Sequence, residues 1–349
     1  MNEKAAGSYK WSITFALLLS GCLLVFALDV MLGSVSIPLS SVFSYLLLGS
    51  TENTSWDIII SQFRIPKAIT AMSVGAALGV SGLQMQTLFR NPLAGPFVLG
   101  ISSGAGLGVA IMIFVGLQFG FFIELTGLSR NGMFIAAAGS GSLLVLVIIL
   151  LTSTRVKDTV SLLIVGLMFG TIASAAVSVL QYFSQAENIQ AYLFWSFGNL
   201  GGVSGSELQA LVSLTSIGLI GSIALSKQLN VMLLGDRYAI SLGLNLKRSR
   251  WLIILNTSVL AGAATAFCGP IAFIGLAVPH IARMLFRTTN HLLLTPLVMM
   301  LGAFFLIVFD ILSQVPGSEI SLPLNAITAL FGGPFVIWMI MKRRTLNYS

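Results

Sequence analysis

The stretch Val231–Leu246, VMLLGDRYAISLGLNL, is a short polar segment interrupted by Gly235 and Gly243. It lies between two long apolar runs, Leu208–Leu225 and Trp251–Phe267. Of the 349 residues, 56% are hydrophobic and only 8% are charged, and the mean hydropathy is +0.97. Because a soluble domain carries about 25% charged residues, this composition predicts a polytopic membrane protein.

Further apolar runs of this kind follow one another along the whole chain. Lipid cannot satisfy backbone polar groups, so membrane spans must be α-helices or closed barrel strands. The runs are unbroken, about 20 residues long, and lack the alternation of barrel strands. We therefore expect an all-α fold in which residues 1–349 form a single transmembrane domain of ten helices. The expected spans are Trp11–Val30, Ile65–Phe89, Phe97–Leu117, Phe134–Leu151, Val160–Phe183, Leu208–Leu225, Trp251–Phe267, Ile271–Phe286, Leu294–Leu312 and Leu322–Met341.

The distribution of charge predicts the orientation. Lys and Arg in short loops are retained on the cytoplasmic side of a membrane. With the N-terminus inside, fifteen of the 18 cations fall inside, together with only three of the 11 acidic residues. Both termini are therefore expected in the cytoplasm. The net charge of +7 reflects this topology and calls for no nucleic-acid partner.

Two of the three outer cations flank Pro66 in the sequence RIPK, at the outer start of the second span. Arg64 and Lys67 would face an extracytoplasmic partner there, because paired surface charges steer protein encounters. The alternative is that both side chains extend to lipid headgroups from a helix end.

The expected spans carry no Asp, Glu, Lys or Arg at their midpoints. An ion-coupled transporter usually has such a group, because it binds the coupling ion. This absence counts against a secondary transporter, although backbone carbonyls at broken helices could still bind sodium. The chain instead has 35 glycines, and several of them in the spans lie four residues apart, as at Gly75 and Gly79, which indicates closely packed helices.

The sequence offers no motif for soluble chemistry. It has no GxxxxGK[ST] phosphate loop, so the chain is not expected to bind ATP in that way. The two cysteines, Cys22 and Cys268, and the two histidines, His280 and His291, do not have the spacing of a zinc site. We expect no enzymatic activity, no metal site and no cofactor in this chain.

Four segments resemble the FecCD-type permeases, in the same order from residue 64 to the C-terminal end. These permeases are the membrane subunits of type II ABC importers for iron-siderophore complexes, haem and cobalamin. The segments are RIPKAITAMSVGAALGVSGLQMQTLFRNPLAGPFVLGISSGAGLG (64–108), LLGDRYAISLGLN (233–245), CGPIAFIGLAVPHIAR (268–283) and LPLNAITALFGGPFVIW (322–338). Four ordered motifs are far more specific than any one of them.

The resemblance implies a ten-helix subunit that pairs with a second permease subunit, as a homodimer or close heterodimer, around the transport path. It also implies two cytoplasmic ATPase subunits, which bind ATP and Mg²⁺, and an extracytoplasmic substrate-binding protein. The loop at about 227–250 would form two short helices that dock into the ATPase, with Asp236 and Arg237 orienting the contact. An amphipathic turn lying on the membrane is the alternative. The motif positions of this coupling loop are Gly235, Asp236, Arg237, Ala239, Leu242 and Gly243.

Arg64 and Lys67 match family positions that receive acidic residues of the binding protein. A third such position commonly holds Arg in the family, but here it is Gln314, which puts a three-cation docking site in doubt. Asn325 stands where the family more often has Gly, and it either faces the transport path or caps the last helix.

Three further residues correspond to the transport path of the family. Trp195 belongs to a short outer segment, SQAENIQAYLFWSFGNL from Ser184, which is either an aromatic rim of the cavity or an interfacial aromatic belt. Thr159 and Ser161, at the inner start of the fifth span, correspond to the cytoplasmic gate.

These features together predict an importer subunit of the bacterial cytoplasmic membrane that works by alternating access. Siderophores and haem make up the larger part of the cargo in the family, so we expect an iron complex. A cobalamin importer of the same family is the first alternative. An ion-coupled secondary transporter and a non-transporting scaffold are the alternatives from other classes.

Overall fold

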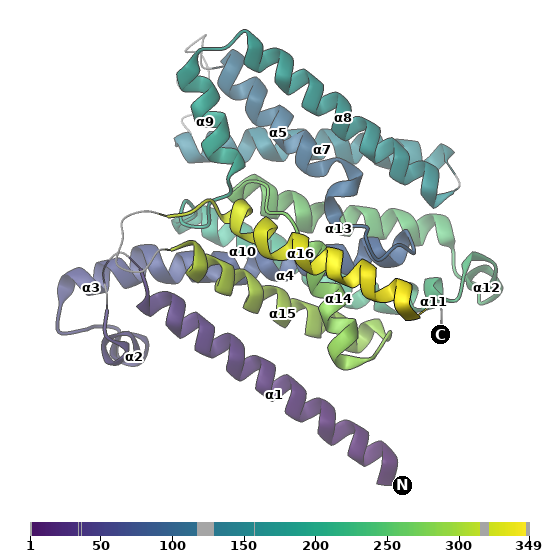
Figure 1. Ribbon diagram of the computed structural model, residues 1–349, viewed down its shortest axis with the longest axis horizontal. Helices are drawn as coiled ribbons and strands as arrows, with labels where there is room; N and C mark the ends of the chain where they lie inside the picture. The colour runs from purple at the N-terminus through teal and green to yellow at the C-terminus, as the bar shows by residue number, and fades with distance from the viewer. Residues whose placement is uncertain are drawn as a thin grey trace.

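The computed structural model describes residues 2–33, 35, 37–116, 129–156, 158–314 and 321–346. Within these residues every regular element is a helix, apart from an isolated bridge between Gln314 and Ser321. The helices run largely side by side along one direction (Figure 1). They are α1 (Asn2–Met31), α2 (Leu39–Leu48), α3 (Thr54–Ile59), α4 (Ile65–Leu88), α5 (Ile101–Ile111), α7 (Arg130–Arg155), α8 (Thr159–Tyr182), α9 (Ala186–Ser196), α10 (Gly205–Ala224), α11 (Ser226–Leu233), α12 (Asp236–Ser241), α13 (Leu246–Cys268), α14 (Ile274–Phe286), α15 (His291–Ser313) and α16 (Leu324–Leu346).

Within the described residues, seven helical segments are long and apolar enough to cross a membrane. They coincide with seven of the ten expected spans, at Trp11–Met31, Thr54–Leu88, Asn131–Ser153, Val160–Tyr182, Gly205–Ala224, Leu246–Cys268 and His291–Ser313. The other three expected spans coincide with shorter apolar helices at Ile101–Val115, Ile274–Phe286 and Leu324–Met339. A fourth short apolar helix, Leu39–Leu48, was not expected.

Prolines and glycines explain why two of these helices start later than predicted. The expected third span began at Phe97, but Pro96–Leu99 forms a 3₁₀ turn, and Gly100 (φ 74°) turns the chain into α5. The expected eighth span began at Ile271, but Gly269 (φ 74°) ends α13 and α14 starts only at Ile274. The second span, by contrast, starts earlier than predicted. A π-helical segment, Ile60–Arg64, joins α3 to α4, so the helix begins well before Ile65.

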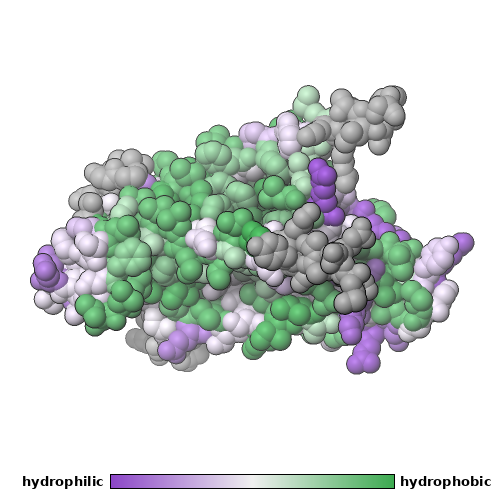
Figure 2. Space-filling model, turned by 90° about the horizontal axis from the view of Figure 1, so that it is seen from below, coloured by the Kyte–Doolittle hydropathy of each residue, from purple (hydrophilic) through white to green (hydrophobic). Residues whose placement is uncertain are grey.

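Helix α4 is the centre of the bundle. Every residue from Val74 to Leu88 is buried, and α4 packs against α10, α13, α14 and α15. The outer helices α1, α7, α8 and α10 instead expose most of their apolar side chains. Figure 2 shows a face that is largely hydrophobic along its middle, with hydrophilic residues toward the two ends. This pattern fits a bundle whose sides contact lipid or another apolar surface.

Glycines bring α4 into backbone contact with two neighbours. A Cβ atom at Gly75 would lie 2.2 Å from the carbonyl oxygen of Gly302 on α15. A Cβ atom at Gly82 would lie 1.6 Å from the carbonyl oxygen of Gly275 on α14. Such contacts are how small residues hold membrane helices together, and they confirm the close packing expected at Gly75.

The two ends of the bundle differ. The start of α1, the end of α16 and the pair α11 and α12 lie at one end, whereas α2 and α3 lie at the other (Figure 1). The start of α1 and the end of α16 therefore share a side (Figure 1), as the ten expected spans would require. We call the end with α11 and α12 the inner end and the opposite one the outer end.

We expect Gly75→Leu to destabilise the bundle, because its side chain would collide with the backbone of α15. Overpacking of this kind costs about 1–3 kcal/mol of unfolding free energy. Thermal unfolding of purified protein in detergent would measure the loss. Gly139→Ala is the matched control, because a Cβ atom there meets nothing within 4 Å. Equal unfolding temperatures for the two variants would contradict the packing described here.

Candidate functional site

The coupling loop folds as two short helices joined by a glycine. Helix α11 ends at Leu233, Gly235 takes φ 104°, and α12 begins at Asp236. A second left-handed glycine, Gly243 (φ 81°), follows α12 and leads into α13. Positive φ is strained for residues with a side chain, so the two glycines are what allow this compact turn. Ala239 of α12 is fully buried, so it lies on the face of the short helix that packs onto the bundle.

The carboxylate of Asp236 is held by two arginines of the same chain. One oxygen lies 2.5 Å from Nη2 of Arg90, just beyond the end of α4, and the other lies 2.8 Å from Nη2 of Arg250 on α13. Asp236 thus joins the start of α12 to two long helices. Its carboxylate holds α12 on its own bundle, and the predicted role of Asp236 in orienting an ATPase contact stays a prediction. Arg237, the next residue, is exposed.

Large apolar side chains cover the outside of this loop. Five of them are at least 43% exposed, and charged residues lie between them in the sequence. Exposed apolar clusters rimmed by charge mark protein or membrane contact sites. We call them the α11–α12 surface: Leu233, Leu234, Tyr238, Ile240 and Leu242. Of these, only Leu242 was singled out from the sequence, although the apolar residues in VMLLGDRYAISLGLNL were a usable signal.

Arg64, at the outer end, binds the end of the first helix. Its guanidinium donates to the carbonyl oxygens of Val30 and Met31, both at 2.7 Å, and to that of Val35. These carbonyls include orphan acceptors that a helix leaves at its C-terminus. The side chain is therefore engaged within the chain, and docking of a partner at Arg64 stays a prediction.

Lys67 lies beside a buried pair of carboxylates. Its Nζ is 2.9 Å from Oδ2 of Asp310, and its side chain is 23% exposed. Gln314 donates to the same Oδ2 at 2.8 Å and to Oδ1 of Asp29 at 3.1 Å. Lys67 and Gln314 are therefore neighbours, because both contact the carboxylate of Asp310. A role for Lys67 in docking also stays a prediction.

Trp195 lies in an aromatic cluster on α9. Its ring is 5.9 Å from that of Tyr192, which in turn is 5.7 Å from Phe114. Trp195 also lines a cavity of about 250 Å³ at the outer end, together with Asn131 and Asn199. Burial raises the pKa of Tyr192 above its ordinary value, so its hydroxyl stays neutral.

Asn325 ties three segments together near the outer end. Its backbone N–H donates to the carbonyl of Phe197 at 3.0 Å, and its side-chain Oδ1 accepts the backbone N–H of Ala272 at 3.1 Å. The side chain therefore bonds to the break between α13 and α14, and it does not cap α16. The end of α9, this break and the start of α16 meet at Asn325.

The inner start of α8 contains the two predicted gate residues. Asp158 caps the helix, because its Oδ1 accepts the backbone N–H of Ser161 at 2.7 Å. Hydrogen bonds from Ser161 hold the pKa of Asp158 below its ordinary value, so this cap stays ionised. Ser161 lies in the first turn of α8, and the side chain of Thr159 is outside the described residues.

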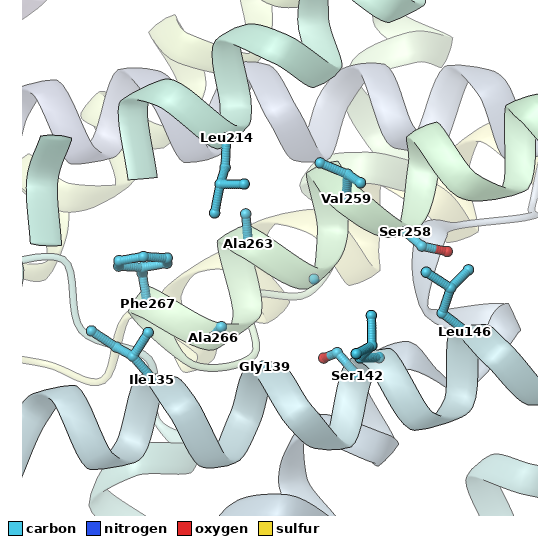
Figure 3. Close-up of a pocket in the computed structure, with 12 residues that line it drawn as sticks. Ile135, Gly139, Ser142, Leu146, Leu214, Ser258, Val259, Ala263, Ala266 and Phe267 are labelled. Atoms are coloured by element: carbon cyan, nitrogen blue, oxygen red, sulfur yellow. The ribbon is translucent and has the colours of Figure 1, made fainter. Parts of the chain in front are cut away.

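A lateral cavity of about 310 Å³ opens between α7, α10 and α13 (Figure 3). Its walls are uncharged and include Ser142 and Ser258 as the only side-chain hydroxyls. None of the sequence-predicted path residues lines it. Within the residues described, no group of three or more His, Cys, Asp or Glu side chains is arranged to hold a metal ion.

The geometry defines a helical, multi-pass membrane protein with two short helices, α11 and α12, exposed at one end. The model of the FecCD transport family matches residues 19–342, and the chain belongs to this family. It is 36% identical to the hemin transport system permease protein HmuU of Yersinia pestis, over 94% of this chain and 96% of that protein. It is 35% identical to the vitamin B12 import system permease protein BtuC of Klebsiella pneumoniae, over 85% and 86%.

A solved structure has the same fold over nearly the whole chain. It is an inward-facing conformation of a metal-chelate type ABC transporter, with a TM-score of 0.81 and 28% identity over 95% of this chain and 99% of the other. PsaBC from Streptococcus pneumoniae shares the fold more distantly, with a TM-score of 0.55 and 17% identity over 80% of this chain and 92% of the other. The prediction of an all-α, type II ABC permease fold is therefore confirmed. The chain is a transport permease, as its relatives are.

We expect Asp236→Ala to loosen α12, because both links to the long helices are lost. The pairs are partly exposed, and such pairs contribute about 0.2–1 kcal/mol. Losing this free energy makes local opening of α12 more frequent, and amide hydrogen exchange proceeds through such openings. Hydrogen exchange at residues 236–243 should therefore accelerate roughly two- to fivefold. Arg237→Ala, at the exposed neighbouring position, should leave the exchange unchanged. Identical exchange in the two variants would show that Asp236 does not hold the helix.

Proposed function

We propose that this chain is the membrane subunit of an ATP-driven importer that carries an iron complex, a siderophore or haem, into the cell. The observation that carries the proposal is the α11–α12 surface. Five large apolar side chains are presented at the inner end on helices anchored by Asp236 and Ala239. An apolar surface that is held in place by its own bundle is suited to receive force from another protein.

The partner at the inner end is proposed to be a pair of ABC ATPase subunits, which bind ATP and Mg²⁺. Gly235, Arg237, Leu242 and Gly243 belong to the coupling loop in this proposal, and Asp236 and Ala239 hold it in place. The bias of Lys and Arg toward this end supports its assignment to the cytoplasm. The chain would then lie in the bacterial cytoplasmic membrane with both termini inside.

A second permease subunit is proposed to complete the transport path. Helix α8 exposes a row of apolar side chains at helical spacing, among them Val160, Ile164, Met168 and Ile172. Such a row is suited to contact another copy of the chain or lipid. A substrate-binding protein would dock at the outer end near Lys67, whose side chain is partly exposed.

Transport is proposed to occur by alternating access. ATP-driven movement of the coupling loop would switch the bundle between outward-open and inward-open states. Trp195 and Asn325 at the outer end, and Thr159 and Ser161 at the inner end, would border the path. A transport path with uncharged walls would suit a bulky cargo that must not bind strongly in both the outward-open and the inward-open state. Only a difference in affinity between these two states can shift the equilibrium between them.

The identity of the cargo is the finest part of the proposal. Relatives named for hemin and for vitamin B12 are 36% and 35% identical to this chain, so identity separates them little. The match to the hemin permease covers more of this chain than the match to the vitamin B12 permease, 94% against 85%. This longer match supports an iron complex, with cobalamin as the second candidate.

We expect Leu242→Asp to weaken ATPase binding about tenfold, because a buried carboxylate would replace an apolar contact. Co-purification with the cognate ATPase and ATP-driven uptake into proteoliposomes would measure the loss. Ser206→Asp, which adds the same charge at an exposed position of α10 near the outer end, should retain binding and uptake. Wild-type binding by Leu242→Asp would refute the docking assignment.

The cargo can be assigned by uptake into proteoliposomes that contain the permease, the ATPase and the binding protein. We expect ATP-dependent uptake of a ferric siderophore or haem, and none of cobalamin at the same concentration. Uptake of cobalamin alone would establish the second candidate. Uptake driven by an ion gradient without the ATPase would overturn the proposed class.

A further inference from the structure

A buried histidine joins three helices at the inner end. His291, the first residue of α15, is 1% exposed. Its Nε2 lies 2.9 Å from Oγ1 of Thr87 on α4, and its Nδ1 lies 2.8 Å from Oδ1 of Asn230 on α11. One imidazole therefore contacts side chains from both flanking helices.

The surrounding hydrogen bonds determine how this group is protonated. Oδ1 of Asn230 also accepts the backbone N–H of His291 at 2.8 Å, and Nδ2 of Asn230 donates to Oδ1 of Asn290 at 2.8 Å. Because Oδ1 of Asn230 accepts, Nδ1 of His291 carries the proton, and Nε2 of the neutral ring is an acceptor facing Thr87. The hydroxyl of Thr87 lies 2.9 Å from both Nε2 and the carbonyl oxygen of Leu83, so its one hydrogen is shared between these two acceptors.

This polar chain adds direction to an otherwise apolar attachment. Leu229 and Met232 of α11 are buried against Met85 and Leu88 of α4. Apolar contacts are non-directional and tolerate small sliding movements. Hydrogen bonds weaken steeply when their angle or length changes. A displacement of α11 is therefore resisted at His291 before it is resisted by the apolar side chains.

The receiving helices are suited to pass such a displacement on. Helix α4 is buried along its inner two thirds and touches α10, α13, α14 and α15. At Gly75 the backbone of α4 contacts α15, and at Gly82 it contacts α14. No flexible side chain lies between the helices at these two points to absorb a movement. A movement that reaches α4 and α15 is thus shared with most of the bundle.

We propose that Thr87, Asn230 and His291 are positioning residues that pass movement of the α11–α12 surface to α4 and α15. The inference rests on the proposed function, because it takes the force at that surface to come from an ATPase. It assigns a function to a histidine that neither the docking loop nor the transport path requires.

The test compares cargo moved per ATP hydrolysed in proteoliposomes containing the complete importer. Asn230→Leu removes the acceptor and the donor at similar size, and we expect the ratio to fall about fivefold, a typical coupling effect. Asn230→Asp keeps an acceptor for both groups of His291, next to the N-terminus of α15 where a negative charge is favourable. It loses only the donor to Asn290, so this variant should keep a higher ratio than Asn230→Leu.

The structural control is Thr257→Val. It removes a buried side-chain hydrogen bond of 2.7 Å between α13 and Gln84 of α4, outside α11. If lost stability alone were responsible, this variant would lower the ratio as much as Asn230→Leu. Equal losses, or a wild-type ratio in Asn230→Leu, would overturn the inference.

Two further outcomes are informative. If Asn230→Leu does not assemble, Thr87→Val breaks the same chain from α4, and the same fall in the ratio is expected. A wild-type ratio in Thr87→Val would then overturn the inference. If the wild-type importer moves no cargo with its ATPase, the proposed function fails, a result distinct from coupled transport that is insensitive to these substitutions.

Discussion

The bundle depends on the close approach of α4 to the helices around it. Between membrane helices there is little hydrophobic driving force, so van der Waals packing must hold them. At Gly75 with Gly302, and at Gly82 with Gly275, the backbones approach so closely that a side chain would not fit between them. The outer helices can therefore leave apolar faces free for lipid or a second subunit, and the loops can carry function.

The inner end illustrates how a short loop is made rigid without a core of its own. Helix α12 has six residues, which is too short to be stable alone. Buried Ala239 and the two arginine contacts of Asp236 fix it to α4 and α13, and Asn230 fixes α11 to α15. The apolar side chains on the outside can then be presented in one arrangement, which lowers the entropic cost of binding a partner.

Much of the fold could be predicted from the sequence, because lipid leaves few alternatives to helices. The positions of the ten apolar helices and the glycine turns of the coupling loop were local properties. The helix Leu39–Leu48 was missed because its ten residues are too few to span a membrane. The partners of Asp236, Lys67 and Asn325 could not be predicted, since Arg90, Asp310 and Ala272 are distant in sequence and no local pattern pairs them. For the same reason, only the structure shows that Arg64 and Lys67 have partners within the chain.

The contacts of Asn325 have a geometric consequence for the outer end. Its backbone bonds to the last residues of α9 and its side chain to the break before α14, while the residue itself belongs to α16. A tilt of α16 would therefore also shift the end of α9, which carries Trp195, and the segment between α13 and α14. These three elements would move together at the outer end, and none of them could adjust alone.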